Sequence, residues 1–233
     1  MMILAANFKM NHTRASTKLY IDRLQICGKP ENIQIYLFPP FTALDRYESV
    51  AVIGAQNGYP ARNGSYTGEI GLEQLEEFEI KTILLGHSER RHLLGEDQEF
   101  IAKKFDFYKQ AGFEIFYCVG ETLEVRKSGS KELMEAYLEA QLEGIDTAYE
   151  KLVIAYEPVW AIGTGQSATP QDIQEALAYL RTKSGAPLLY GGSVKPQNIA
   201  QILEISECDG ALIGTASWDV EQFCEMIQIA KEL

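Results

Sequence analysis

The feature that most constrains the fold is an alternation of two apolar patterns along the whole chain. Short runs rich in β-branched and aromatic residues recur, and most are apolar without interruption, which is typical of parallel strands covered on both faces. We count eight such runs: Met2–Asn7, Ile33–Phe38, Val50–Ala55, Thr82–Gly86, Phe113–Cys118, Leu152–Tyr156, Leu188–Tyr190 and Ala211–Ile213.

Amphipathic segments with helical spacing lie between these runs. They are Thr17–Cys27, Phe100–Ala111, Lys131–Ala148, Pro170–Leu180 and Ser217–Ile229, with short helices expected near residues 38–51 and 70–82. Thr169 is a suitable N-cap for the helix that begins at Pro170. Repeated strand–helix units without a Ser/Pro-rich linker favour an α/β fold, a single-domain (β/α)₈ barrel over residues 1–233, and not an open doubly wound sheet. No GxGxxG motif follows the first run, which removes the main support for a nucleotide-binding domain.

Composition excludes several classes of partner. Apolar residues make up 46% and charged residues 23% of 233 residues, which is ordinary for a soluble globular chain. No apolar stretch approaches the ~20 residues of a membrane span, and the start lacks the basic region of a signal peptide, so we expect a cytoplasmic protein. The net charge of −12 argues against nucleic acid or an acidic membrane surface as partner. An anionic substrate therefore needs local help, from Lys9 and from backbone N–H groups.

The four cysteines are Cys27, Cys118, Cys208 and Cys224. They lie far apart, and neither a CxxC pair nor a zinc-binding spacing with histidine occurs. We therefore expect reduced thiols, and no metal site or disulfide.

Polar residues follow the predicted strands, at the edge of a (β/α)₈ barrel where catalytic groups lie. The strand ends carry Asn7 and Lys9, His87 to Glu89, Cys118, Glu157, Gly191 to Ser193, and Gly214 with Thr215. Taken singly, each has an ordinary structural explanation: a lysine on the surface, a hydrogen-bonded histidine, a glutamate or glycine in a turn. Their common position at one rim of one barrel favours a functional site.

Several of these segments together resemble one enzyme family. AYEPVWAIGTG at Ala155–Gly165 resembles the signature of triosephosphate isomerases, as do NFKMN at Asn7–Asn11, GHSERR at Gly86–Arg91, CVGE at Cys118–Glu121 and YGGSV at Tyr190–Val194. They stand in the family's order and nearly at its spacing, over almost the whole chain. The resemblance implies a TIM barrel that interconverts dihydroxyacetone phosphate and glyceraldehyde 3-phosphate, a step of glycolysis and gluconeogenesis, with no metal or organic cofactor.

The resemblance also implies an acid–base pair. Glu157 is similar to the family's general base, and burial beneath Trp160 and Ile162 is expected to disfavour its charge and strengthen it as a base. His87 is similar to the family's neutral electrophile, a pairing for which triosephosphate isomerases are the standard example. A helical turn over Ser88–Leu94 would point its N-terminus at the imidazole and disfavour the charged ring.

Further roles follow from the same resemblance. Lys9 resembles the cation that attracts the substrate and stabilises the enediolate, and Asn7 the residue that binds a substrate oxygen. Glu89 resembles the carboxylate that pairs with the lysine in the resting site. Arg90 and Glu96 resemble a structural ion pair.

The expected phosphate site consists of backbone N–H groups. Gly163, Ser193, Gly214 and Thr215 match the family positions whose amides bind the phosphate. Pro158–Ala168 resembles the family's mobile lid, whose closure protects the enediolate from losing phosphate to water.

The segment Asn57–Ile70 is too long for an ordinary strand–helix connection. In the family this loop docks into a second subunit, where Thr67 supports Asn7 and Lys9, so the resemblance implies a homodimer through the loop around Thr67. Three departures from the family pattern occur: Phe8 in place of the usual tryptophan, Thr215 in place of a common glycine, and the hinge Gln166-Ser167-Ala168.

Two alternative functions are compatible with a barrel of this kind. A different phosphosugar enzyme on the same barrel, such as a phosphoribosyl isomerase, would also bind phosphate after the last two strands, but the segment YEPVWAIGTG argues against it. A catalytically silent barrel kept as a binding protein is hard to reconcile with Asn7, Lys9, His87 and Glu157 occurring together.

Overall fold

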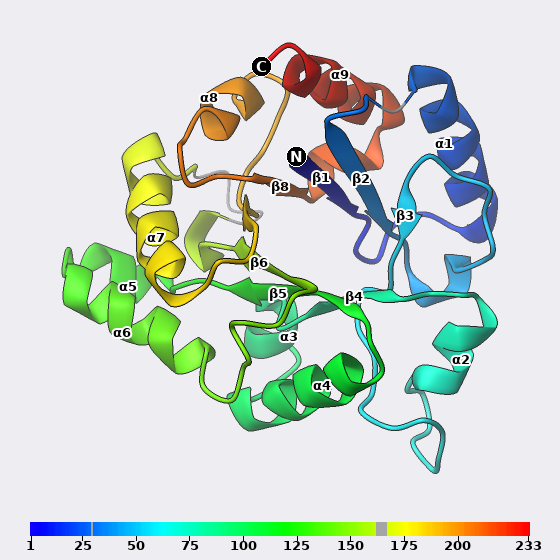
Figure 1. Ribbon diagram of the computed structural model, residues 1–233, viewed down its shortest axis with the longest axis horizontal. Coiled ribbons are helices and arrows are strands. Elements are labelled where there is room, and N and C mark those ends of the chain that lie inside the picture. The colour runs from blue at the N-terminus through cyan, green and yellow to red at the C-terminus, as the bar shows by residue number, and fades with distance from the viewer. Residues whose placement is uncertain (29, 162–166) are drawn as a thin grey trace.

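The strands of this protein form a barrel that is surrounded by helices (Figure 1). The computed structural model describes residues 1–28, 30–161 and 167–233. One sheet of eight strands has the order β3-β2-β1-β8-β7-β6-β5-β4, and an isolated bridge between Ala55 and Ile83 joins its two edges. The predicted (β/α)₈ architecture is therefore confirmed.

The strands run β1 (Met2–Asn7), β2 (Ile33–Phe38), β3 (Val52–Ile53), β4 (Thr82–Leu85), β5 (Glu114–Val119), β6 (Leu152–Tyr156), β7 (Leu188–Tyr190) and β8 (Gly210–Ile213). The α-helices are α1 (Arg14–Cys27), α2 (Leu72–Glu77), α3 (Ser88–His92), α4 (Gln98–Gln110), α5 (Leu123–Lys127), α6 (Lys131–Gln141), α7 (Pro170–Lys183), α8 (Ile199–Leu203) and α9 (Val220–Lys231). Short 3₁₀ turns are η1 (Phe41–Ala43), η2 (Val159–Ala161) and η3 (Thr215–Trp218). Across the described ranges, no helix has both the length and the apolar character that a membrane span requires.

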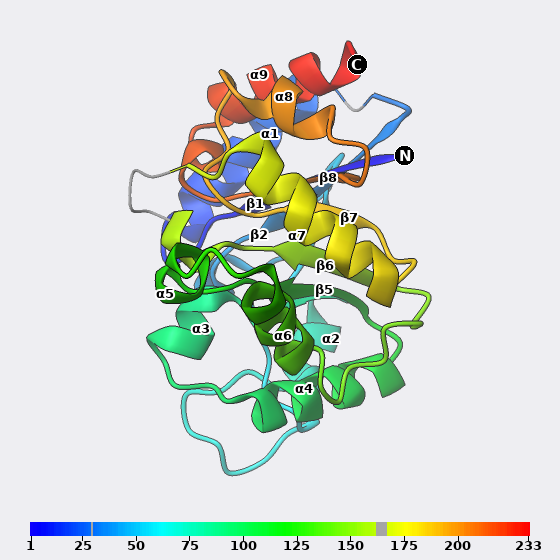
Figure 2. The same cartoon turned by 90° about the vertical axis from the view of Figure 1, so that its left-hand side faces the viewer.

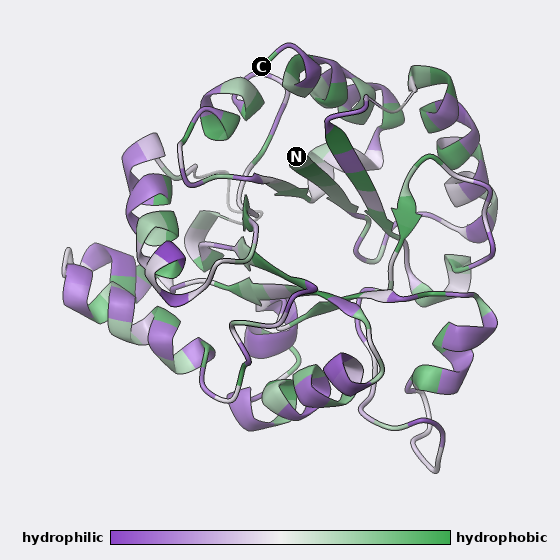
Figure 3. Ribbon diagram, viewed as in Figure 1, coloured by the Kyte–Doolittle hydropathy of each residue, from purple (hydrophilic) through white to green (hydrophobic). Residues whose placement is uncertain are grey.

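Every strand except β3 contributes to two separate apolar cores, which explains why these strand sequences are apolar without interruption. Alternate residues such as Ile3 and Ala5 face the barrel interior. Their neighbours Leu4 and Ala6 pack outward, against the helices. Figure 3 shows the result: the strands are mainly apolar, whereas the helices carry polar residues on their outer surfaces.

Two element boundaries differ from the prediction near glycines. Strand β3 has only two residues, Val52–Ile53, and at the following Gly54 a Cβ atom would lie 2.4 Å from the Phe38 ring. Helix α6 ends at Gln141 and does not continue to Ala148, because the chain reaches a positive φ of 75° at Gly144.

Capping residues decide two other helix boundaries. As predicted, Thr169 caps α7, and its side chain accepts a hydrogen bond from the Asp172 N–H. The last helix was expected to begin at Ser217, but Asp219 caps it and α9 begins at Val220. The residues before it form the 3₁₀ turn η3.

The expectation that all cysteines are reduced is wrong for one pair. A disulfide joins Cys27, the last residue of α1, to Cys224 in α9. Strand β1 pairs with β8, so the first and last helices of the barrel become neighbours and bring together two residues that lie 197 positions apart. Cys118 and Cys208 are free and buried.

The long connection between β3 and α2 extends away from the barrel (Figures 1 and 2). Its two ends are joined by a 2.8 Å hydrogen bond from the Tyr59 N–H to the Ile70 carbonyl. The rings of Tyr59 and Tyr66 stack with centroids 4.1 Å apart. Thr67 lies exposed near the tip. The loop is thus internally ordered, and its tip projects from the rest of the chain.

Candidate active site

A cavity of about 410 Å³ opens at the carboxyl ends of the strands. The strand ends that meet there come from β1, β4, β6, β7 and β8. The lining residues are Asn7, Lys9, His87, Glu157, Ala161, Gly191, Gly192, Ser193, Val194, Lys195, Leu212, Gly214, Thr215, Ala216 and Gln222.

Glu157 directly follows β6 and is only 3% exposed. Its N–H donates to the Val119 carbonyl at 2.7 Å, which ties it to the end of β5. Two glycines make room for it. A Cβ on Gly120 would lie 1.8 Å from the Glu157 carbonyl oxygen, and a Cβ on Gly191 would lie 2.7 Å from its Cγ. The backbone on both sides therefore confines this residue to one position.

The Glu157 carboxylate is held by two neighbouring groups. Its Oε2 accepts a 3.2 Å hydrogen bond from the Ser88 N–H, and its Oε1 lies 3.2 Å from Nε2 of His87. Burial acts to raise the pKa of this carboxyl group, but the contact with His87, the Lys9 ammonium and the Ser88 N–H together outweigh it, so the pKa lies below its ordinary value.

His87 occupies the N-cap position of α3, and this fixes its tautomer. Its Nδ1 accepts a 3.2 Å hydrogen bond from the Glu89 N–H, so Nδ1 carries no proton in this arrangement. The proton of the neutral ring therefore sits on Nε2, which faces Glu157 and the cavity.

Lys9 is held in an unusual backbone conformation, with φ of 51°. The Oδ1 atom of Asn7 accepts a 2.9 Å hydrogen bond from the Lys9 N–H, and Gln56 donates to the Lys9 carbonyl at 2.8 Å. The ammonium group forms a 2.6 Å ion pair with Glu89. These contacts fix the cation at the cavity wall beside Gly214, where an added Cβ would lie 3.4 Å from Lys9 Cε.

Comparison with known proteins agrees with this arrangement. The family model for triosephosphate isomerase matches residues 2–230. A triosephosphate isomerase of a Nitratiruptor species is 67% identical over 232 residues, covering 100% of both chains. Those of a Sulfurovum species and of Wolinella succinogenes are 58% and 56% identical, each over 97% of this chain and 99% of the relative.

The chain belongs to the triosephosphate isomerase family.

This triosephosphate isomerase fold brings together the described residues that were predicted to act in catalysis or substrate binding, whereas Glu89 and Cys118, also expected at the rim, do not line the cavity. Asn7, Lys9, His87, Glu157, Ser193, Gly214 and Thr215 all line the one cavity. Gly163 lies outside the described residues, as does the central part of the expected lid, residues 162–166. Among the described residues, no group of three or more His, Cys, Asp or Glu side chains is placed to hold a metal ion.

The triosephosphate isomerase base is influenced by more than burial. Burial was expected to disfavour the charge on Glu157, and it does act to raise the pKa of this carboxyl group. The contacts with His87, Lys9 and Ser88 outweigh it, so the pKa is lowered. The sequence shows the apolar residues around the carboxylate, but the Ser88 N–H reaches it only because α3 begins there. In the resting site the Glu157 carboxylate is therefore ionised, and hydrogen-bond donors of the protein stabilise its charge.

Two polar residues of the triosephosphate isomerase cavity were missed by sequence reasoning. Lys195 and Gln222 both line the cavity. Lys195 follows the YGGSV segment directly, so its proximity to Ser193 could have indicated its position. Gln222 lies in the first turn of α9, and no local sequence signal indicates that this turn faces the cavity.

Two departures from the triosephosphate isomerase family pattern, Phe8 and Thr215, can be placed in the structure, whereas Gln166 of the third lies outside the described residues. Phe8 is fully buried, with its ring 4.8 Å from that of Tyr20 in an edge-on contact. Thr215 is exposed and begins η3. Thr215 also lines the cavity.

Proposed function

We infer that this chain is a triosephosphate isomerase, which interconverts dihydroxyacetone phosphate and D-glyceraldehyde 3-phosphate in glycolysis and gluconeogenesis. The full-length identity of 67% to a triosephosphate isomerase carries this conclusion. The cavity is consistent with it: a buried carboxylate, a neutral imidazole and an ammonium group face one small space. A triose phosphate is a ligand of suitable size and charge for that space.

Glu157 is the base that moves a proton between the two neighbouring carbons of the substrate. In the resting site its carboxylate is held by Ser88 and His87. For catalysis it must leave the Ser88 N–H and turn toward the substrate carbon. Loss of that donor and exclusion of water both raise its pKa, so the base becomes stronger once the substrate is bound.

His87 stabilises the negative charge that develops on the substrate oxygens. Its Nε2–H is directed at the cavity, because Nδ1 is occupied by the Glu89 N–H. A neutral imidazole can donate a hydrogen bond to an enediolate oxygen and still keep its proton. The substrate oxygen takes the place that Glu157 Oε1 has in the resting site.

Lys9 attracts the dianionic substrate, while Ser193, Gly214 and Thr215, together with Gly163, provide the phosphate-binding amides. In a chain of net charge −12, such a local cation is needed to attract an anionic substrate, and Lys195 lines the same cavity. We expect Lys9→Ala to raise the inhibition constant of glycerol 3-phosphate about 10-fold or more at low salt, with a smaller effect at high salt. Lys18→Ala is the control, since Lys18 pairs with Asp22 on an exposed helix face. Equal inhibition constants for the two variants would place the phosphate elsewhere.

A coupled assay tests the proposed activity. Protein purified from a host that lacks its own isomerase is given glyceraldehyde 3-phosphate, and dihydroxyacetone phosphate is followed with glycerol-3-phosphate dehydrogenase and NADH. We expect rapid oxidation of NADH with wild-type protein and almost none with Glu157→Gln. Wild-type protein without turnover would refute the proposed function.

We further propose a homodimer through the loop around Thr67. The loop projects from the barrel with Thr67 exposed, and Tyr66 is 46% exposed. Met10, next to Lys9, is 95% exposed, and Leu93 and Leu94 near the site are also largely exposed. Such apolar residues around a catalytic rim indicate a surface that a partner covers. Light scattering coupled to size exclusion should give twice the 26.1 kDa chain mass, and a fully active monomer would contradict the dimer.

A further inference from the structure

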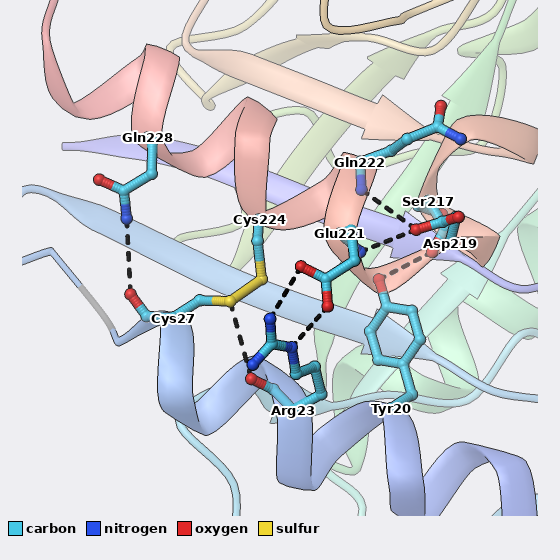
Figure 4. Close-up of a disulfide and its surroundings, with 9 residues drawn as sticks. All are labelled: Tyr20, Arg23, Cys27, Ser217, Asp219, Glu221, Gln222, Cys224 and Gln228. Carbon is cyan, nitrogen blue, oxygen red and sulfur yellow. Dashed lines mark hydrogen bonds and ion pairs between the residues drawn. A yellow bond between two sulfur atoms is a disulfide. The ribbon is translucent and has the colours of Figure 1, made fainter.

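The first and last helices of the barrel are covalently joined through two cysteines that do not line the active-site cavity. Cys27 ends α1, and Cys224 lies in the second turn of α9. Their Cα atoms are 6.0 Å apart, within the range that disulfides span without backbone movement. Figure 4 shows the bond crossing the seam between the two helices.

Noncovalent contacts hold the same seam independently of the bond (Figure 4). The Tyr20 hydroxyl donates to the Ser217 carbonyl at 2.7 Å, a buried contact. The Arg23 guanidinium binds the Glu221 carboxylate through two nitrogens, at 2.5 and 3.1 Å. The end of the seam nearest the active site is thus well fixed, whereas at the other end the Gln228 amide donates to the Cys27 carbonyl over a longer 3.5 Å.

We propose that Cys27 and Cys224 form a reversible thiol–disulfide exchange site, a covalent latch between α1 and α9 that responds to small-molecule thiols and disulfides. Accessibility supports this assignment. Cys27 is half-buried, whereas Cys224 is only 6% exposed, so Cys27 is the more accessible residue of the pair. Attack should therefore occur at Cys27.

The other two cysteines are not suited to such exchange. Cys118 is fully buried behind Glu157, and burial raises the pKa of its thiol far above the ordinary value. Burial likewise raises the pKa of Cys208 to about 11. Since the thiolate is the reactive form, both are inert at neutral pH. They provide an internal reference for counting thiols.

The exchange balances with a dithiol as reductant. A dithiol thiolate attacks Cys27 Sγ, the protein S–S bond breaks, and Cys224 leaves with the electron pair and takes a proton from water. The second thiolate of the reagent then attacks the mixed disulfide and releases the Cys27 thiol, leaving a cyclic disulfide. A small-molecule disulfide such as oxidised glutathione reverses the reaction, with release of two reduced molecules.

The latch should act on stability and leave catalysis unchanged. It connects residues 197 positions apart, so it restricts nearly the whole unfolded chain, and this restriction grows with the length enclosed. The active-site end of α9 does not depend on it. Asp219 caps the helix through the Glu221 and Gln222 N–H groups, at 2.8 and 3.2 Å, and Tyr20 holds Ser217.

The experiment compares wild-type protein equilibrated with oxidised glutathione or with dithiothreitol, alongside Cys27→Ser in both reagents. Alkylation in denaturant followed by mass spectrometry should count two thiols in the oxidised wild type and four after reduction. We expect reduction to lower the thermal midpoint of the wild type by about 5–10 °C. Cys27→Ser should match the reduced wild type in both reagents. Because the reduced wild type is measured directly, the test does not depend on the variant folding well.

Hydrogen exchange and steady-state kinetics distinguish a local latch from a disulfide that affects the whole structure. Hydrogen exchange should increase on reduction in the last two turns of α9 and at the end of α1, with α4 unchanged as the internal control. Values of kcat and KM should agree between the two redox states within about twofold. Four alkylated thiols after oxidation, or equal thermal midpoints, would overturn the proposal. A large change in KM would refute the separation of the latch from the site.

Discussion

The position of one carboxylate is decided by residues that have no side chain. Glu157 lies between Gly120 and Gly191, each of which is too close to it for a Cβ atom. A catalytic base must meet its substrate carbon within a fraction of an ångström. Gly120 of the CVGE segment and Gly191 of the YGGSV segment therefore position the catalytic base, in addition to any role in a turn.

Gly191→Ala tests this at the scale of a single atom. The new Cβ would lie 2.7 Å from Glu157 Cγ, so the carboxylate must shift. We expect kcat to fall about 10–100-fold, because a displacement near 1 Å is enough for such a loss, with circular dichroism unchanged. Gly185→Ala is the matched control, as its Cβ meets nothing within 4 Å. Equal kcat values for the two variants would show that Glu157 tolerates displacement.

The lowered pKa of Glu157 predicts the acid limb of the rate profile. A base acts only when ionised, and a lowered pKa keeps this carboxylate ionised at and somewhat below its ordinary value of 4.5. We therefore expect kcat/KM, calculated per dianionic substrate because phosphate itself titrates near pH ~6, to stay level down to about pH 4.5 and to fall only below it. An inflection of kcat/KM clearly above pH 4.5 would mean that, in the free enzyme, burial of Glu157 outweighs the contacts that lower its pKa.

At the scale of elements, α3 organises the site although it has only five residues. Its first turn presents Ser88 and Glu89 to the catalytic groups, and an ion network holds the helix at Arg90. Glu96 binds Arg90 at 2.6 Å and the buried Lys104 at 2.5 Å. Lys104 in turn donates to Asn57 at the base of the projecting loop. One carboxylate thus connects three segments.

Glu96→Gln should destabilise the protein by ~3 kcal/mol, because it leaves Lys104 buried without a counter-charge. Chemical denaturation measures this, with the exposed Glu99→Gln in α4 as control. The pKa of Glu96 is lowered, since Arg90 and Lys104 outweigh its burial. Its contribution to stability is therefore present above pH 4.5 and is lost as the pH falls through the lowered pKa. A variant as stable as Glu99→Gln would show that the network is dispensable.

Most elements could be predicted from the sequence because all strands except β3 pack against two cores. Residues such as Ile3 and Leu4 must both be apolar when both faces of β1 are covered. Strands of this kind can therefore be recognised in the sequence. The residues at which the elements begin and end were harder to predict. The end of α6 depends on Gly144, and the start of α9 depends on Asp219, where capping competed with a continuing apolar pattern.

At the scale of the whole molecule, barrel topology made the site predictable. Parallel strands end at one rim, so residues as distant as Asn7 and Gly214 were expected to converge without any knowledge of tertiary contacts. The disulfide could not be predicted in this way. Its two cysteines meet because α1 and α9 become neighbours when the barrel closes, and nothing in their spacing indicates a pair.

The central claim is that one carboxylate carries the proton between two substrate carbons, and isomerisation in D₂O tests it most directly. Glyceraldehyde 3-phosphate is converted with the product trapped by glycerol-3-phosphate dehydrogenase and NADH, and deuterium at carbon 1 is measured by NMR. A proton held on Glu157 exchanges with solvent, so part of the product should carry deuterium, and Glu157→Gln should form almost no product. Product without deuterium, or undiminished turnover by Glu157→Gln, would contradict the account.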